Sequence, residues 1–198
     1  MALETELKFL GVDLKVLRQR LRDVGGRCGG RFLERNAVFD DAKARLREKN
    51  ILLRLRRDNE IVLTLKRPVQ RTESSRVKVR EEFEVRVQDF GAMTDILRGL
   101  GYEVWFRYEK VREKWRLGAC EVCLDTLPFG EFVEIEGPET EIAALSAKLG
   151  LDGHPVSAKT YHELNLEHQK ANNLPLDHNF VFEQGVREKF LQTPDTGL

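Results

Sequence analysis

The extended segments of this chain carry full charges on one face and mostly apolar side chains on the other. Residues two apart on a strand share a face, because successive side chains alternate. In residues 77–87, lysine, arginine and glutamate occupy one parity, whereas valine and phenylalanine dominate the other. Similar alternation recurs in residues 51–57, 61–66 and 132–136. Such strands form either an open sheet with its charges in water or a closed barrel with its charges inside.

Eight segments are predicted to be strands, and capped amphipathic helices separate some of them. Asp13 and Asp89 each precede an apolar stripe with helical spacing that ends at glycine, which predicts two helices. Pro138 suits the first turn of a third helix. The first two helices share a plan of strand, helix and further strands, which indicates two similar halves. The predicted strands are residues 3–10, 31–39, 51–57, 61–66, 77–87, 105–115, 119–124 and 132–136.

The charged face is rich in arginine and in carboxylates two residues apart. If these charges turn inward and pair only with one another, desolvation costs several kcal/mol per ion. A polyanion and a divalent metal would complete the neutralisation, because arginine forks grip phosphate oxygens and hard cations prefer carboxylate oxygens. The residues alone leave the open sheet and the filled barrel as equal alternatives. The cationic set is Lys8, Arg54, Arg56, Lys66, Lys78, Arg80, Lys110 and Arg112, and the acidic set is Glu4, Glu6, Glu82, Glu84, Asp125, Glu134 and Glu136.

Composition excludes some classes of function. The 198 residues include 33 basic and 33 acidic ones, so the net charge is zero, which argues against a broad nucleic-acid-binding surface. No run approaches the roughly 20 apolar residues of a membrane helix. The first residues lack a basic segment followed by an apolar stretch, so no secretory signal is visible and a cytoplasmic location is expected.

Short charged motifs follow one another along the chain. The first is Glu4-x-Glu6-x-Lys8, and the last is Lys-Thr-Tyr-His-Glu-Leu at residues 159–164. Between them lie the motifs at residues 53–56, 64–66, 80–84, 110–112, 124–125 and 130–136. Taken in this order, they resemble the CYTH superfamily, also called triphosphate tunnel metalloenzymes, over roughly residues 1–166.

The resemblance implies an α+β fold, in which an eight-stranded antiparallel closed β-barrel forms a tunnel with a charged interior and amphipathic helices packed outside. It implies a CYTH triphosphate tunnel domain at residues 1–170 and a C-terminal tail or extension at residues 171–198. The tail lacks periodicity and is expected to be loosely held, although Phe180, Phe182 and Phe190 could dock on the body or on a neighbouring subunit. A homodimer is therefore a possible assembly.

Residue roles are carried over by motif position. The resemblance implies that Mg²⁺ or Mn²⁺ is the cofactor and that Lys8, Arg56 and Lys66 act in catalysis. His162 is interpreted as a surface helix residue rather than as a base. The implied metal ligands are Glu4, Glu6, Glu134 and Glu136, with Glu82, Glu84 and Asp125 also facing the ions. The implied triphosphate ligands are Lys8, Arg54, Arg56, Lys66, Arg80, Lys110, Arg112 and Lys159.

The implied substrate is a small triphosphate: ATP, inorganic triphosphate or thiamine triphosphate. The motifs run closest to proteins classed with class IV adenylate cyclases, which convert ATP to cyclic AMP and pyrophosphate. An inorganic or thiamine triphosphatase, which hydrolyses the terminal phosphate, is the alternative. A further alternative is a non-catalytic polyphosphate- or nucleotide-binding module, but carboxylates would only repel phosphate in such a protein. Neither a membrane nor a nucleic acid is an expected partner.

Overall fold

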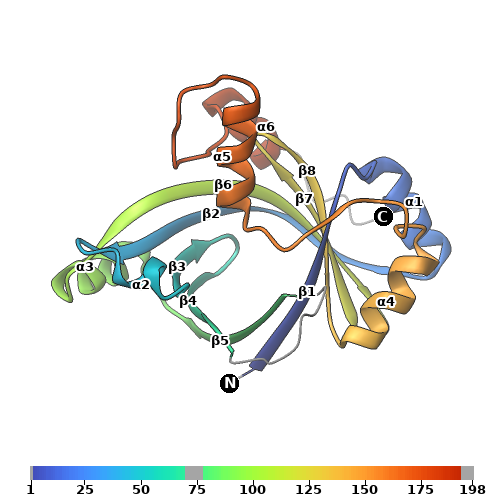
Figure 1. The fold of residues 1–198 in the computed structure, drawn as a ribbon, viewed down its shortest axis with the longest axis horizontal. Helices are drawn as coiled ribbons and strands as arrows, with labels where there is room; N and C mark the ends of the chain where they lie inside the picture. The colour runs from blue at the N-terminus through green and yellow to red at the C-terminus, as the bar shows by residue number, and fades with distance from the viewer. Residues whose placement is uncertain (1, 70–77, 193–198) are drawn as a thin grey trace.

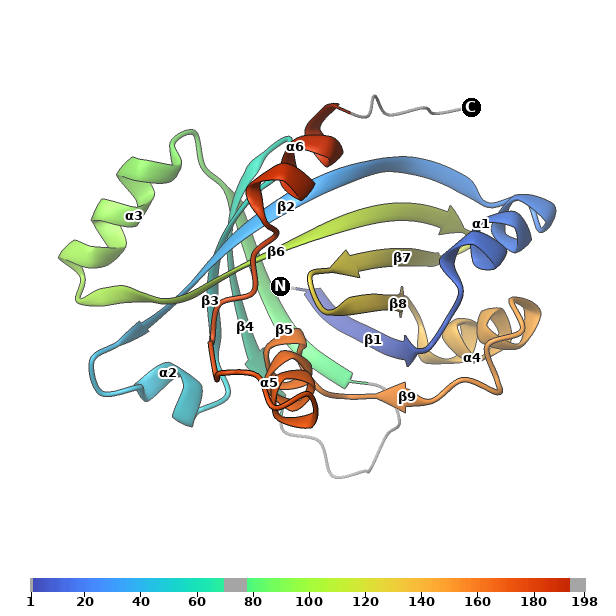
Figure 2. The ribbon, with the colours of Figure 1, turned by 90° about the horizontal axis from the view of Figure 1, so that it is seen from above.

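Eight antiparallel strands close into a barrel (Figures 1 and 2). The computed structural model describes residues 2–69 and 78–192. The strand order is β5-β4-β3-β2-β6-β7-β8-β1, and β1 pairs back with β5 to close the sheet, while the short β9 lies beyond β1. The strands are β1 (Ala2–Leu10), β2 (Arg27–Asp41), β3 (Leu52–Arg57), β4 (Ile61–Pro68), β5 (Lys78–Arg86), β6 (Tyr102–Leu117), β7 (Cys120–Leu127), β8 (Gly130–Glu136) and β9 (Val156–Ser157).

Strands β2 and β6 are much longer than predicted, and they form the long curved ribbons seen from above in Figure 2. Their pairing runs from Arg27 opposite Arg116 to Asp41 opposite Tyr102. Register shifts interrupt it between Cys28 and Gly30 and again between Val38 and Phe39. Such irregularities bend a strand and break its strict alternation, so the pattern of side chains understates its length.

Six helices are formed by the described residues; α1, α3 and α4 pack on the outside of the barrel, and α5 lies at one end of its cavity. The Asp13 and Asp89 side chains accept hydrogen bonds from the first turns of α1 and α3, as predicted. Pro138 is extended and stands just before α4, one position earlier than predicted. None of these helices is both long and apolar enough to cross a membrane. The helices are α1 (Leu14–Asp23), α2 (Arg45–Glu48), α3 (Phe90–Gly99), α4 (Glu139–Lys148), α5 (Tyr161–Ala171) and α6 (Gln184–Gln192).

The hydrophobic core lies between the outer faces of the strands and these helices. Leu17 and Leu21 of α1 pack with Ile135 of β8, and α4 completes this cluster. A second cluster places Leu55 of β3 against Leu97 of α3. With the apolar faces covered from outside, the opposite faces of the strands point into the barrel.

Full charges occupy that interior. Lys8, Arg54, Lys110, Arg112 and Glu134 are each less than 9% exposed. The cross-strand registers bring opposite charges together, with Glu4 opposite Arg80 and Lys8 opposite Glu134. The closed barrel with a charged interior is therefore confirmed, and the open sheet is excluded.

The tail packs on the barrel as far as residue 192. Phe180 forms an isolated bridge with Tyr108 of β6, and the amide of Glu109 donates a 3.0 Å hydrogen bond to the Phe180 carbonyl. The side chains of Phe180 and Phe182 are 5% and 6% exposed. This segment is thus held by specific contacts rather than loosely, whereas residues 193–198 lie outside the described part of the chain.

The packing predicts how the outer core responds to truncation. Leu55 is fully buried, so Leu55→Ala should lower the free energy of unfolding by about 2–5 kcal/mol. Leu100 is 70% exposed, so Leu100→Ala should change it by no more than about 0.5 kcal/mol. Urea unfolding of both variants measures the difference, and equal losses would contradict this placement of the core.

Candidate active site in the barrel interior

A cavity of about 500 Å³ occupies the barrel interior. Side chains from β1, β3, β4, β5, β6 and β8 line its charged part, and α5 and the tail contribute to its other end. Glu4 and Glu136 also line a second hollow, on the side of Ala119 and Gly137. These two carboxylates therefore lie between the two hollows.

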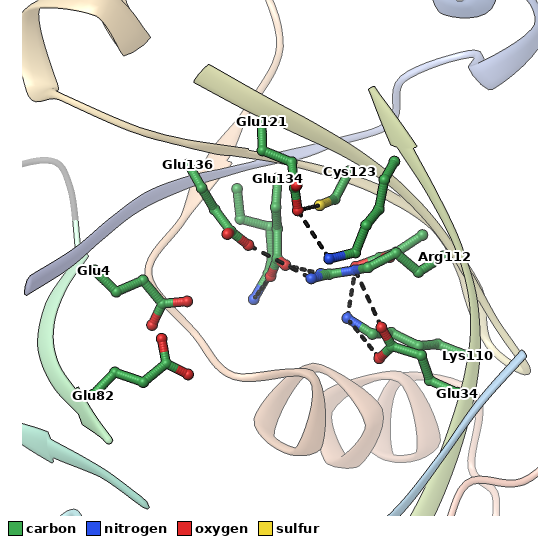
Figure 3. A network of polar contacts seen from close by, with 12 residues as sticks. Glu4, Glu34, Glu82, Lys110, Arg112, Glu121, Cys123, Glu134 and Glu136 are labelled. Carbon is green, nitrogen blue, oxygen red and sulfur yellow. Dashed lines mark hydrogen bonds and ion pairs between the residues drawn. The ribbon is translucent and has the colours of Figure 1, made fainter. Parts of the chain in front are cut away.

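Three carboxyl groups converge in the cavity. Glu4, Glu6 and Glu136 each offer an oxygen, and these three atoms lie within 4.8 Å of one another. Their proximity follows from the fold, because Glu4 and Glu6 share a face of β1 and Glu6 is registered opposite Glu136 of β8. In Figure 3 the side chains of Glu4, Glu82 and Glu136 point toward a common open space. Three oxygens at this spacing suit a hard divalent cation such as Mg²⁺ or Mn²⁺.

The electrostatics of this group also suit a cation. Burial raises the pKa of Glu136, and the neighbouring Glu134 and Glu4 raise it further. The Arg112 guanidinium opposes this, but the pKa still rises to about 7. A positive charge placed beside this carboxyl group would stabilise its ionised form.

Cations form the opposite part of the cavity wall. Lys66 contacts Glu4 at 2.6 Å and Glu82 at 3.1 Å. Burial tends to lower the pKa of Lys66, but chiefly Glu4 raises it overall, so the ammonium group stays charged. Arg54 Nη2 donates to Thr64 at 3.4 Å, and Thr64 in turn donates to Glu84 at 2.9 Å.

A second group of charges is already paired within the wall. Arg112 donates to Asp125 at 2.8 and 2.6 Å and also contacts Glu134. Lys110 and the Tyr161 hydroxyl donate to the same Asp125 carboxylate at 3.1 and 2.7 Å. Asp125 is fully buried, so this network fixes the directions of Lys110 and Arg112, both of which line the cavity.

Glu34 of β2 is a charged group that the strand analysis missed. Its carboxylate is 1% exposed and lies 3.6 Å from Lys110, 3.9 Å from Arg56 and 4.0 Å from Arg112. Burial raises its pKa, but these cations and Arg54 outweigh burial and lower it from 4.5 to about 2. Sorting residues 31–39 by parity would have placed Glu34 on the inner face. Tyr161 carried no such signal, because only the docking of α5 brings it to Asp125.

The structure brings most of the predicted site residues to one cavity. Asp125 is absent from its surface because it lies behind Lys110 and Arg112. The Lys159 side chain pairs with Glu167 at 2.5 Å, half exposed, while its carbonyl accepts a hydrogen bond from Lys8. His162 is half-buried and lines the cavity, unlike the expected surface residue. The predicted residues that line the cavity are Glu4, Glu6, Lys8, Arg54, Arg56, Lys66, Arg80, Glu82, Glu84, Lys110, Arg112, Glu134 and Glu136.

Comparisons with known proteins agree with this geometry. The CYTH domain model matches residues 2–149. A protein of Methanocaldococcus jannaschii named as a putative adenylate cyclase is 27% identical over 142 residues, which cover 71% of this chain and 79% of that protein.

Solved structures show the same fold. A putative adenylate cyclase from Vibrio parahaemolyticus superimposes with a TM-score of 0.67 at 20% identity, covering 82% of this chain and 97% of that one. A Hippeastrum protein gives a TM-score of 0.62 at 19% identity, covering 90% and 99% of the two chains. Its description calls it a putative adenylyl cyclase with a dominant triphosphatase activity. At such identities the likeness establishes the fold alone.

Glu34 generates a pH-dependent prediction. Because its folded pKa of about 2 lies below the ordinary 4.5, the charged form stabilises the fold above pH 4.5, and this contribution is lost as the pH falls toward 2. Glu34→Gln should therefore lower the unfolding free energy by about 3 kcal/mol near neutral pH. The difference from the native protein should shrink below pH 4.5.

Chemical denaturation from neutral pH to about pH 3 measures this difference. Glu131, which is exposed, provides the control: Glu131→Gln should change the unfolding free energy by no more than about 0.5 kcal/mol. A loss in Glu34→Gln that stays constant over the whole pH range would show that the four cations do not hold this carboxylate ionised.

Proposed function

Because this chain belongs to the CYTH domain family, we propose that it is a divalent-metal-dependent enzyme that cleaves a small triphosphate inside the barrel. The observation that carries the proposal is the convergence of Glu4, Glu6 and Glu136 beside a wall of cations in one cavity. Carboxylates would repel a polyphosphate unless a metal joined them to it. The arrangement therefore supports an enzyme over a module that only binds phosphate.

Glu4, Glu6 and Glu136 are the residues that would hold Mg²⁺ or Mn²⁺. An ion held there would supply Lewis-acid chemistry for the triphosphate and would lower the pKa of the attacking oxygen. Glu82 and Glu134 lie in the same cavity and are paired with Lys66 and Lys8, so they adjust the charge around the site. Glu84 lies further along β5, where it accepts a hydrogen bond from Thr64.

The cations would bind and orient the phosphate chain. Arg54, Arg56 and Lys66 come from neighbouring strands β3 and β4, and Arg80 from β5. Lys110, Arg112 and Lys8 complete the ring from β6 and β1. Such groups stabilise the charge that develops on a leaving phosphate, which is the main protein contribution to phosphoryl transfer. Lys8, Arg56 and Lys66 are therefore our candidates for direct action in catalysis.

Two reactions fit this site. Cyclisation of ATP to cyclic AMP and pyrophosphate is our lead, supported by the sequence motifs and by the name of the Methanocaldococcus relative. Hydrolysis of the terminal phosphate of inorganic or thiamine triphosphate is the alternative, supported by the triphosphatase activity stated for the Hippeastrum protein. Incubation with ATP, inorganic triphosphate and thiamine triphosphate, each with Mg²⁺ or Mn²⁺, distinguishes them. Cyclic AMP with pyrophosphate indicates the cyclase, and orthophosphate indicates a hydrolase.

Removal of one carboxylate from the triad tests the metal site. Glu6→Gln or Glu136→Gln should abolish metal-dependent turnover and weaken Mn²⁺ binding, because an amide is a neutral and poorer ligand. Circular dichroism should show that both variants remain folded. Calorimetric titration with Mn²⁺ and product assays measure the two effects. Glu131→Gln, outside the cavity, is the matched control, and full activity in both triad variants would refute the assignment.

Loss of an inner guanidinium should affect both binding and chemistry. Arg56→Ala should raise KM and lower kcat, with a loss of about 100-fold in kcat/KM, because a charge-assisted contact contributes about 1.5–3 kcal/mol. Arg86→Ala is the control, since Arg86 is on β5 but its side chain is 78% exposed. Steady-state kinetics of both variants give the answer. Unchanged constants in Arg56→Ala would place this residue outside the substrate site.

A further inference from the structure

The cavity that contains the charged site continues into an apolar end. β6 contributes three aromatic side chains there, α5 contributes an imidazole, and the tail contributes a phenyl ring. α5 and the tail lie beyond the residues that match the CYTH model, so this wall is partly built by a segment outside the family domain. Its members are Leu52, Trp105, Phe106, Tyr108, His162 and Phe180.

The rings of this wall hold one another in place. Phe106 stacks on His162 with ring centres 4.5 Å apart, and Trp105 meets Phe106 edge to face at 4.9 Å. His162 Nε2 lies 2.9 Å from His178 Nδ1. Phe180 stacks on Tyr108 at 5.0 Å, so the docked tail is held against β6 as part of the wall. The aromatic surface is thus preformed rather than assembled by a ligand.

Planar groups can stack on this wall. The guanidinium of Arg47, a residue that also lines the cavity, lies 4.2 Å from the centre of the Trp105 ring. Burial, followed by the neighbouring His178, lowers the pKa of His162 to about 4, so its imidazole is neutral near pH 7. With Nε2 paired to His178, the neutral imidazole offers Nδ1 as a hydrogen-bonding atom for the polar edge of a heteroaromatic ring.

An inorganic phosphate chain would gain no binding free energy from such a wall. It is strongly hydrated and gains nothing from aromatic contacts, whereas a planar organic group removes the apolar surface of the wall from water when it binds. The cavity volume also falls within the range of about 300–1,000 Å³ that is usual for sites of organic ligands.

We propose that this aromatic end binds a planar heteroaromatic group attached to the triphosphate, so that the substrate is an organic rather than an inorganic triphosphate. Trp105 and His162 are its specificity-determining residues. The inference rests on the proposed function for the phosphate chain, but it concerns a separate set of side chains. A nucleobase and the rings of thiamine share the required chemistry, and the two are distinguished by experiment.

Substrate selectivity provides the first test. A base that stacks on an aromatic side chain binds tighter than one without that contact by about tenfold or more. The ratio of kcat/KM for ATP to that for inorganic triphosphate should therefore fall about tenfold or more in Trp105→Ala and in His162→Ala. Trp105→Phe keeps an aromatic face and should largely retain the ratio. Phe83→Ala is the control, since Phe83 is 39% exposed on β5 and is not part of the cavity.

Tryptophan fluorescence provides a test that needs no turnover. The chain has two tryptophans, and the other one, Trp115, is 4% exposed in the outer core. With Mg²⁺ present, an ATP analogue with both phosphoanhydride oxygens replaced by methylene groups should quench the emission, whereas inorganic triphosphate should not. Trp105→Phe should abolish the quenching.

The outcomes separate the two proposals. If no triphosphate is turned over, the proposed function fails, and the quenching alone decides whether the aromatic end binds a base. An unchanged selectivity ratio in both Trp105→Ala and His162→Ala, or equal quenching by the two ligands, would overturn the inference. The same measurements with thiamine triphosphate distinguish the two rings. The substrate whose kcat/KM, relative to that for inorganic triphosphate, falls more in Trp105→Ala carries the ring that this wall binds.

Discussion

Charge balance inside a closed barrel is the constraint on which this structure depends. Lys8, Lys110 and Arg112 are nearly inaccessible to water, and so are Glu34 and Asp125. Isolated ions at such depth are strongly disfavoured, so each of these groups stands beside an opposite charge. The antiparallel registers make this possible because they place Lys8 opposite Glu134 and Arg112 opposite Asp125. The pairing of strands and the pairing of charges therefore have to be satisfied together.

The interior charges fall into two groups with different freedom. Arg112, Lys110, Asp125 and Tyr161 form a buried network in which the single carboxylate accepts hydrogen bonds from all three donors. Lys66, Glu4 and Glu82, on β4, β1 and β5, line the same cavity as Lys110 and Arg112 but pair with one another there. The first group holds its members in fixed directions, while in the proposed function the second would exchange its protein partners for a metal and phosphate oxygens. A site of this kind combines preorganisation with the capacity to be neutralised by its ligand.

The placement of the hydrophobic core outside the barrel explains how a polar interior can be tolerated. The strands β1, β3, β7 and β8 bury apolar side chains against α1, α3 or α4 rather than against a facing sheet, whereas Phe83 and Val85 of β5 stay exposed. The helices thereby supply the apolar contacts that the interior does not. The docked tail adds another layer, since Phe180 and α5 close one end of the cavity with aromatic rings. One cavity thus joins a charged region to an aromatic one, and the two regions come from different parts of the chain.

The sequence by itself determined the local features. Alternation on the strands, the Asp13 and Asp89 caps and the carboxylate spacing of Glu4 and Glu6 depend only on neighbouring residues. Alternation alone left the open sheet and the barrel equally acceptable, and the family motifs decided between them. The parity of Glu82 and Glu84 predicted that they face inward, and both line the cavity.

Only the tertiary structure decided which of these residues meet. Strand register selected Glu136 as the partner of Glu4 and Glu6 and left Asp125 behind two cations, while Lys159, just before α5, pairs with Glu167 of that helix. The irregular pairing of β2 and β6 hid the length of both strands, and the docking of the tail placed Phe180 in the cavity wall. Closing the β1–β5 seam and packing the tail join residues that are distant in the chain. The energies of these long-range contacts depend on the tertiary arrangement, which a local pattern of residues does not determine.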